Sequence, residues 1–389
     1  MREGWEYKKL GEVATLINGF AFQSAMFQKA GLPIVRISNI QDDKITSDFV
    51  YFNRGDYNID FEKYEVLYGD ILIAMSGATT GKVGINYNDE VLYLNQRVGK
   101  IVPRENIIQR YLFYYLKTNA AKSLSIAQGV AQPNLSTQQI NSFVLPVPPL
   151  SEQQRIVSEL DLLSSIIEKK KTQLKEYDQL AQSIFYDMFG DPVENPKGWE
   201  VKRYRDFAEI IGGYAFNSKS FVDSGVPVLK IGNINTGVLR LEEICYYPYT
   251  PSLKRYEVHS GDLVISLTGT TGKDDYGNIC IIPSYADTFY LNQRNAILRP
   301  NETCNNIFLQ YVFKQRTIKK ELTKNNHGVR QANILNQDIL GLSIPLPPLP
   351  LQQSFASKIE AIERQKALIQ QSIAEVQMLF DSHMDDWFA

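Results

Sequence analysis

Cysteine and histidine are scarce in this sequence, with three residues of each type among 389. The cysteines, Cys245, Cys280 and Cys304, lie far apart without a C-x-x-C spacing, and the histidines are equally scattered. Structural metal sites use clusters of these residues at short fixed spacings, so we expect no metal site. A sparse, odd set of cysteines also favours reduced thiols, as in a cytoplasmic protein.

Long apolar runs are absent as well. No stretch approaches the roughly 18 consecutive apolar residues that indicate a membrane-spanning helix. The first residues, MREGWEYKK, lack the apolar segment of a secretion signal. We therefore expect a cytoplasmic protein without a membrane partner.

A strong excess of positive charge is also missing, because 41 Lys and Arg stand against 43 Asp and Glu, for a net charge of −2. Many DNA-binding proteins are basic, so the distribution of charge matters more than its sum. Residues 106–151 contain no Asp or Glu, and residues 305–337 contain only Glu321. Local basic faces are therefore expected, although surface charge without a binding role explains the same pattern.

An internal repeat organises the whole chain. The segment that begins GWEYKKLGEVATLINGFAF at Gly4 returns as GWEVKRYRDFAEIIGGYAF at Gly198. Later matches follow in the same order: TTGK at 79–82 and 270–273, LNQR at 94–97 and 291–294, and G-V-x-Q-x-N at 129–134 and 328–333. Each copy ends in a proline-rich segment, LPVPPL (145–150) or IPLPPL (344–349). Short runs such as 32–37, 70–75 and 262–267 predict strands, and 107–117 and 307–314 predict amphipathic helices.

A long helix is predicted after each copy. Residues at alternating spacings of four and three run from Ile156 to Met188, and from Phe355 to Trp387 in the same register. They are mostly apolar, as in a coiled coil, although Lys170 and Lys366 interrupt the seam, either to set the register or with their amines in solvent. A capping box of Ser151 with Gln154 is expected to start the first helix, and Gly190 and Pro192 to end it.

These patterns predict an α+β protein with a pseudo-twofold internal repeat. Two β-rich domains, 1–150 and 191–350, would be separated by a long antiparallel two-helix coiled coil formed by 151–190 and 351–389. The antiparallel arrangement follows if the ends of the second domain lie close together, as domain termini often do.

No catalytic motif is found. SGATTGKVG (76–84) resembles a phosphate-binding loop, but the spacing between its glycines is too short, and Val83 follows Lys82 where a Ser or Thr would bind magnesium. The Pro-Pro pairs have no preceding Asn or Asp, as a DNA methyltransferase motif would require. No Ser/His/Asp or Cys/His set is present in both copies. We therefore expect no catalytic residues and no cofactor in this chain.

The repeated polar loops are instead the candidate DNA-binding sites, since lysine and arginine contact phosphate or guanine, and Gln and Asn contact base edges. Each has a structural alternative: an ordinary hairpin tip for TTGK, a buried hydrogen-bond network for LNQR, and loop pinning for G-V-x-Q-x-N. The candidates are Thr80, Lys82, Gln96, Arg97, Gln132, Asn134, Thr271, Lys273, Gln293, Arg294, Arg330 and Gln331.

The phrases LPVPPLSEQQRIV (145–157) and MFGDPVENPKGWE (188–200), between two diverged copies, resemble the specificity subunits of type I restriction-modification systems. The resemblance covers the full chain. One departure is Pro350, which stands where the first copy has Ser151, and this puts the first turn of the second helix in question.

The resemblance implies that each domain reads one half of a split, asymmetric sequence in double-stranded DNA, and that the helices set the spacing and dock two DNA methyltransferase subunits. Those subunits would bind S-adenosylmethionine and modify adenine. Restriction subunits that act as nuclease and translocase, with ATP and magnesium, would join where a system has them.

Two other interpretations stay open at this point: a coiled-coil adaptor with two protein-binding heads, and an enzyme with an unrecognised motif. If the domains read different half-sites, the discriminating residues should lie where the copies diverge, chiefly at 41–68 with 235–260 and at 83–93 with 274–290.

Overall fold

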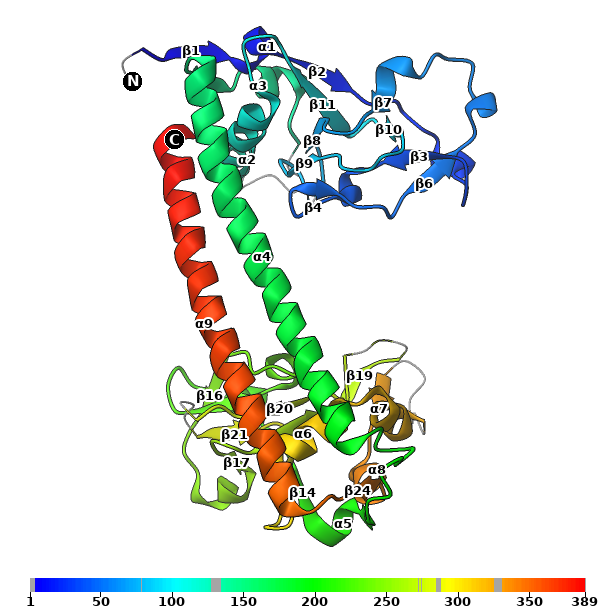
Figure 1. Cartoon of the computed structure of the whole chain (residues 1–389), viewed down its shortest axis with the longest axis vertical. Coiled ribbons are helices and arrows are strands. Elements are labelled where there is room, and N and C mark those ends of the chain that lie inside the picture. Colours follow the sequence, from blue (N-terminus) through cyan, green and yellow to red (C-terminus); the bar gives the residue numbers. More distant parts are fainter. Residues whose placement is uncertain are drawn as a thin grey trace. The chain divides into compact units, whose positions relative to one another are not determined.

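The computed structural model describes residues 4–77, 79–126, 134–271, 273, 275–284, 288–324 and 331–388, without the side chains of 120–126 and 331. The chain divides into two compact units (Figure 1). Unit 1 comprises Met1–Lys171 and Gln370–Ala389, and unit 2 comprises Thr172–Ile369. Each unit mixes helices with sheets, so the α+β class is confirmed.

Unit 1 is built from short strands, as its many Gly, Asn and Pro turns predict. The predicted strands at 32–37 and 70–75 are β3 and β8. The strands are β1 (Glu6–Lys9), β2 (Ala14–Asn18), β3 (Leu32–Val35), β4 (Ile40–Gln41), β5 (Lys44–Ile45), β6 (Val50–Phe52), β7 (Glu65–Val66), β8 (Ile71–Ala74), β9 (Val83–Ile85), β10 (Leu92–Leu94), β11 (Val98–Pro103) and β12 (Val144–Val147). The short helices are α1 (Leu10–Val13) and α3 (Thr137–Asn141), and α2 spans Gln109–Ile126.

Unit 2 repeats these elements. Its strands are β13 (Val201–Arg203), β14 (Ala208–Gly212), β15 (Val226–Leu229), β16 (Cys245–Tyr247), β17 (Glu257–Val258), β18 (Leu263–Ser266), β19 (Thr268–Thr270), β20 (Ile279–Ile281), β21 (Phe289–Leu291), β22 (Asn295–Pro300), β23 (Gln331–Asn333) and β24 (Ser343–Pro345). Its helices are α5 (Tyr204–Phe207), α6 (Asn306–Lys314), α7 (Arg316–Thr323) and α8 (Asn336–Leu340).

The strand order shows that the sequence repeat is also a repeat of fold. In unit 1 the sheets run β2-β11-β8-β9-β5-β4, β6-β3-β10-β7 and β1-β12. In unit 2 the corresponding orders are β14-β22-β18-β20, β16-β15-β21-β17 and β13-β24. The parallel pair β3–β10 has its counterpart in β15–β21, whereas the other pairs at matching places are antiparallel. Unit 2 therefore reproduces the topology of unit 1, except that its described strands include no counterparts of β4 and β5 and that β19 and β23 form an additional sheet.

Two long helices complete the units: α4 (Leu150–Phe189) and α9 (Leu349–Phe388). The division into units passes through both helices, so each unit contains one part of each. In unit 1, His383 lies 3.9 Å from Glu159, and in unit 2, Lys366 lies 2.7 Å from Asp178. Within unit 2, Phe185 also packs against Phe355, so that as α4 advances its partner positions on α9 move backward. The two helices thus run in opposite directions within a unit.

The helix ends correct one prediction and confirm another. The capping box at Ser151 is wrong, because α4 begins at Leu150 and Ser151 lies within its first turn, where the Pro149 carbonyl accepts from the amides of Glu152 and Gln153. Pro350 fits the first turn of α9, since that position needs no amide donor. Gly190 takes a left-handed conformation, with φ of 77°, directly after α4, as predicted.

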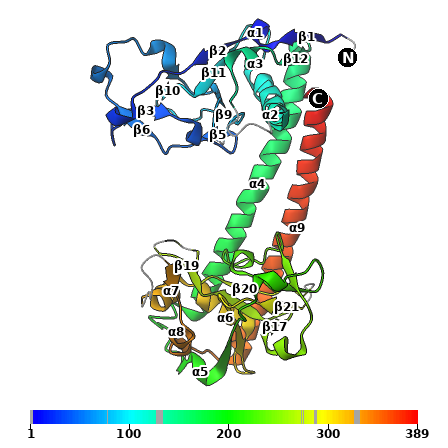
Figure 2. The same ribbon diagram turned by 180° about the vertical axis from the view of Figure 1, so that it is seen from behind.

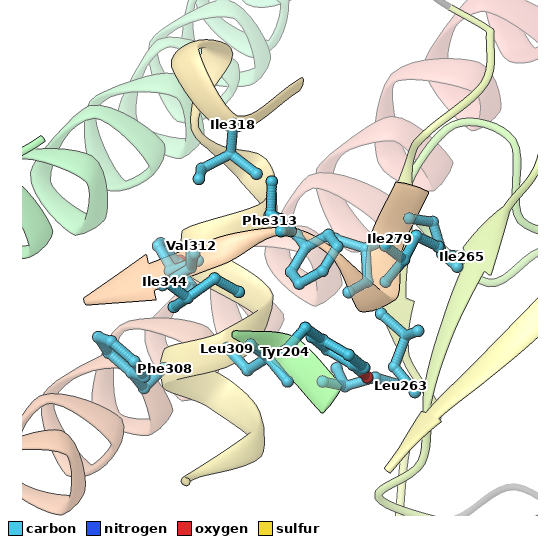
Figure 3. Close-up of a cluster of buried hydrophobic side chains, with 14 of the residues drawn as sticks. Tyr204, Leu263, Ile265, Ile279, Phe308, Leu309, Val312, Phe313, Ile318 and Ile344 are labelled. Carbon is cyan, nitrogen blue, oxygen red and sulfur yellow. The ribbon is translucent and has the colours of Figure 1, made fainter. Parts of the chain in front are cut away.

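Each unit has a hydrophobic core to which the sheet that contains β8 or β18, the helix α2 or α6, and the two long helices contribute. Figure 3 shows this core in unit 2, where side chains from the sheet and from α6 point toward one another. In unit 1, α2 lies beside α4 (Figures 1 and 2), and the Arg110 guanidinium on α2 donates to Asp161 on α4 at 2.7 Å. The long helices are thereby part of each unit's core.

Candidate nucleic-acid interface

Three separate segments of unit 1 are joined by main-chain hydrogen bonds at the end of β8. The amide of Met75 donates to the carbonyl of Arg97 at 2.9 Å, and the carbonyl of Met75 accepts from the amide of Leu135 at 2.8 Å. The loop after β8, the LNQR turn and the segment before α3 therefore converge. These are the three repeated motifs that the sequence singled out.

Unit 2 builds the same frame. The amide of Leu267 donates to the carbonyl of Arg294 at 2.9 Å, and the carbonyl of Leu267 accepts from the amide of Ile334 at 2.8 Å. Beyond this point, β19 and β23 form a short antiparallel ladder. Among the described residues of unit 1, a bridge joins Ser76 and Asn134 at the corresponding place.

In the LNQR turn, the main chain is hydrogen-bonded to the rest of the unit, whereas the Gln and Arg side chains are exposed. The Gln96 amide donates to the Phe20 carbonyl at 2.8 Å, and the Gln293 amide donates to the Tyr214 carbonyl at 2.9 Å. The side chains of Gln96 and Arg97, like those of Gln293 and Arg294, are exposed. No hydrogen bond or ion pair of these four side chains occurs within the described residues, so the alternative of a buried network applies to the main chain alone.

A recurring glycine makes this turn possible. A Cβ placed on Gly19 would lie 2.1 Å from the carbonyl oxygen of Asn95, and one on Gly213 would lie 2.1 Å from that of Asn292. Real side chains cannot approach a backbone so closely, so only glycine lets the strand end pass over the LNQR turn. The repetition of this glycine therefore reflects the geometry of the site.

A cleft of about 700 Å³ opens beside the frame of unit 1. Gln96, Arg97 and Asn134, three of the predicted residues, line it together. The remaining described lining is Asn18, Met75, Ser76, Gly77, Leu135, Ser136 and Thr137, and it contains no carboxylate. A cation among neutral hydrogen-bonding groups is suited to a phosphate or to the polar edge of a base.

Lys82 lies in a different hollow, of about 350 Å³, with Asp42, Asp43 and Lys117. Lys117 pairs with Asp43, whereas exposed Lys82 has no ion pair among the described residues. The structure thus brings Arg97 into the cleft and leaves Lys82 outside it. Lys82 is available to an external anion.

Thr80 requires a correction. Its residue is 1 % exposed, and its hydroxyl donates to the Gly77 carbonyl at 2.6 Å. The side chain therefore shapes the loop from inside, and in this conformation it has no surface to offer DNA. Burial of a threonine within a Gly-rich loop was not visible from its polar neighbours in the sequence.

The unit 2 loop holds its lysine differently. Thr271 and Lys273 are exposed, as expected for a contact surface. The carboxylate of Asp275 accepts from the Thr270 amide at 2.8 Å and from the Thr270 hydroxyl at 2.9 Å. These interactions hold the pKa of Asp275 below its usual value. The largest contribution is the hydrogen bond from the Thr270 amide, followed by that from the Thr270 hydroxyl and by the charge of Lys273. Lys273 therefore lies close enough to Asp275 to interact with its charge.

The G-V-x-Q-x-N motif is only partly described. Gln132 and Arg330 lie outside the described residues, as does the side chain of Gln331. The main chain of Gln331 pairs with Thr270 in the β19–β23 ladder. Asn134 is exposed in the cleft, so loop pinning is the role of the backbone here.

Other polar residues that line the cleft were missed in the sequence: Asn18, Ser76, Ser136 and Thr137. Asn18 and Thr137 are not identical in the two copies, so a search for repeated residues passes over them. Ser76 and its counterpart Thr268 each have a buried hydroxyl without a protein hydrogen-bond partner among the described residues. The sequence did offer a signal for this position, because a hydroxyl-bearing residue follows the same strand in both copies.

The described residues contain no group of three or more His, Cys, Asp or Glu side chains placed to hold a metal ion. All three cysteines are free thiols, and burial raises the pKa of Cys280 and of Cys304 to about 12. In the described part of the chain, no helix has the length and apolar character needed to cross a bilayer.

A family model described as the type I restriction modification DNA specificity domain matches residues 2–176 and again 196–378. The chain belongs to this family. The specificity protein therefore contains two copies of the domain, and its role is DNA sequence specificity rather than catalysis. The resemblance found in the sequence is confirmed.

Curated relatives carry the same description. The type I restriction enzyme MjaVIII specificity subunit of Methanocaldococcus jannaschii is 25% identical over 381 residues, covering 93% of this chain and 86% of the relative. The EcoKI specificity subunit of Escherichia coli strain K12 is 22% identical over 394 residues, covering 92% of this chain and 82% of the relative.

Solved structures share the fold. A chain from work on complex assembly and conformational transition of the type I R-M system has a TM-score of 0.59 and 20% identity, covering 100% of this chain and 98% of that chain. The S subunit of a type I restriction-modification system from M. genitalium has a TM-score of 0.55 and 14% identity, covering 99% and 96%. At these identities the likeness concerns the fold alone.

Proposed function

We propose that each unit of this specificity protein contacts one half of a split, asymmetric sequence in double-stranded DNA through its repeated three-segment frame. The observation that carries the proposal is the frame itself, which has the same hydrogen bonds in both units. Each frame presents an exposed arginine, Arg97 or Arg294, that has no ion pair among the described residues. Lys82 and Lys273 lie on the loops of the same frames. Shared residues of this kind suit contacts that both halves need, such as phosphate binding.

Substitution of the arginines tests the DNA contact. In the complex reconstituted with its partner subunits, Arg97→Ala and Arg294→Ala should each weaken DNA binding, whereas Arg97→Lys should retain part of the affinity through its charge. Thermal unfolding serves as the control for folding. Folded variants that bind DNA as tightly as the unchanged protein would contradict the proposal and would favour the adaptor with protein-binding heads.

The long helices are proposed to form an antiparallel two-helix coiled coil between the recognition domains, with 1–150 and 191–350 as the heads and 151–190 and 351–389 as the rod. The opposite helix directions within each unit support this arrangement. So does the burial of seam positions such as Ile156, Leu160 and Ile359. A rod of fixed length would set the spacing between the two half-sites.

The outer faces of the helices are proposed to dock two DNA methyltransferase subunits. Leu180 on α4 and Leu379 on α9 occupy equivalent positions in the two helices, each directly before a seam residue, and both are 47 % exposed. One lies in each unit, so they offer the same apolar contact twice. The methyltransferase subunits would bring S-adenosylmethionine, and restriction subunits, where present, would bring ATP and magnesium.

The docking proposal predicts a separation of stability from assembly. Leu180→Asp and Leu379→Asp should leave urea unfolding of the specificity protein within about 0.5 kcal/mol, because both side chains already face solvent. Binding of purified methyltransferase subunit should weaken, and the double variant should bind least. Unchanged stoichiometry and affinity in the double variant would place the docking surface elsewhere.

A further inference from the structure

One wall of the unit 1 cleft is a paired asparagine and threonine. The side-chain Nδ2 of Asn18, on β2, lies 3.0 Å from the Thr137 hydroxyl, and the side-chain Oδ1 of Asn18 lies 3.3 Å from the same hydroxyl. This contact holds the two side chains against each other. Asn18 and Thr137 line the cleft together with Gln96, Arg97 and Asn134.

Unit 2 has a different pair at the same place. Gly212 ends β14 where Asn18 ends β2, and Asn336 begins α8 where Thr137 begins α3. The main-chain frame that positions these elements is the same, since Leu135 and Ile334 donate to corresponding carbonyls. A Cβ placed on Gly212 would lie 3.3 Å from the side-chain nitrogen of Asn336.

The amide is therefore present in both units but comes from opposite sides. In unit 1 it extends from the sheet and is held by a hydroxyl on the helix. In unit 2 it extends from the helix and lies over a glycine on the sheet. An asparagine on both sides would crowd the same space, which explains why the two positions change together.

We infer that these two pairs, Asn18 with Thr137 and Gly212 with Asn336, are specificity-determining for the DNA half-site that each unit reads. The inference rests on the proposed DNA contact at the frame. An asparagine amide both donates and accepts, and it can pair with the edge of adenine in the major groove. Because the amide starts from opposite walls, it would meet a different base or a different edge in each unit.

The positions lie outside the diverged segments 41–68 and 83–93 to which the sequence comparison assigned discrimination. They border the shared Gln96 and Arg97, so a shared phosphate contact and a variable base contact would be adjacent. This placement distinguishes the pairs from residues that differ between copies only because they face solvent.

The test exchanges the pair as a unit. First, modified sites are mapped across a genome for the unchanged protein in its complete complex, which defines the two half-sites. Asn18→Gly with Thr137→Asn is then compared with Thr137→Ser, which keeps the hydroxyl. Competitive binding to oligonucleotides that vary one base at a time gives the relative affinity at each position, and thermal unfolding reports folding.

We expect the double exchange to change base preference at one or two positions of a single half-site, by tenfold or more, roughly the discrimination of one base contact. Thr137→Ser should keep the original preference. Uniform weakening across all bases, or an unchanged preference, would overturn the inference.

Arg97→Ala in the same assay separates the two claims. If Arg97→Ala weakens binding uniformly while the double exchange leaves the preference unchanged, the proposed DNA contact stands and the inference fails. If Arg97→Ala changes nothing, the proposed contact itself fails. The reciprocal exchange, Gly212→Asn with Asn336→Thr, should alter the other half-site only.

Discussion

At the scale of single residues, two buried glutamines account for the sequence phrase at the start of each long helix. The Gln153 side chain donates to the carbonyls of Asn106 and Pro148 and accepts from the amide of Ile108. Gln352 makes the equivalent bonds to Thr303, Pro347 and Asn305. Each glutamine thereby ties the helix start to the segment before α2 or α6. No apolar residue of similar size could satisfy these groups.

Replacement of Gln153 should therefore destabilise the protein, whereas replacement of its neighbour should not. Gln153→Leu removes the hydrogen-bond partner of the partly buried Ile108 amide and of two carbonyls, and we expect a loss of about 2–3 kcal/mol in the free energy of unfolding. Gln154→Leu, at an exposed position, should change it by less than about 0.5 kcal/mol. Urea unfolding of both variants checks the difference, and equal effects would show that the buried bonds contribute little.

Lys82 allows an electrostatic prediction. Because its amine has no ion pair among the described residues, Lys82→Ala should weaken binding to all DNA sequences alike and lower the salt slope of log K by about one. Lys82→Arg, which keeps the charge, should retain the slope. Titrations of the complete complex at several salt concentrations measure both quantities. A sequence-dependent effect would instead make Lys82 a base-reading residue.

Single-residue predictions from the sequence depended on burial, which the sequence does not show. The repeated LNQR was noted as a candidate contact, and the close approach of Gly19 to its main chain explains why that glycine recurs in both copies. Thr80 and Ser151 were assigned wrongly because a hydroxyl can serve a loop, a cap or a ligand equally well in a sequence. The Asn18–Thr137 contact joins residues far apart in the chain, so local patterns could not reveal it.

At the scale of elements, the long helices were the most predictable part. Each helix has 40 residues, and the spacing of mostly apolar residues runs from Ile156 to Met188 and from Phe355 to Trp387. The seam positions that the structure describes are buried or half-buried. Lys366 is a polar seam position for which two roles were open, setting the helix register or placing its amine in solvent. Its amine instead forms ion pairs with Asp178 and Glu363. The strands have two to six residues, too few for a period to define their pairing.

The helix packing within unit 2 gives a matched comparison on α9. Ile359 is 3 % exposed, whereas Leu368 is 60 % exposed. Ile359→Asp would bury an unpaired carboxylate and should cost more than about 3 kcal/mol in unfolding free energy. Leu368→Asp should cost less than about 0.5 kcal/mol. Thermal and urea unfolding measure the difference. An Ile359→Asp variant with an unchanged free energy of unfolding would show that this face of α9 is not packed in the core.

At the scale of the whole molecule, the repeat was visible in the sequence and returns as matching sheet orders in the two units. Two copies of a DNA specificity domain in one chain suit a target with two unlike halves. The function class was accessible because ordered motifs cover the whole chain. The contacting atoms were not, because they depend on how distant segments converge at one strand end.

Each unit is proposed to read its own half-site. This claim is tested most directly by replacing residues 5–149 with the first head of another specificity protein and mapping the modified sites genome-wide by single-molecule sequencing. We predict that one half-site changes to that of the donor, while the other half-site and the spacing between them stay the same. A change in both half-sites, or in neither while modification continues, would contradict the claim.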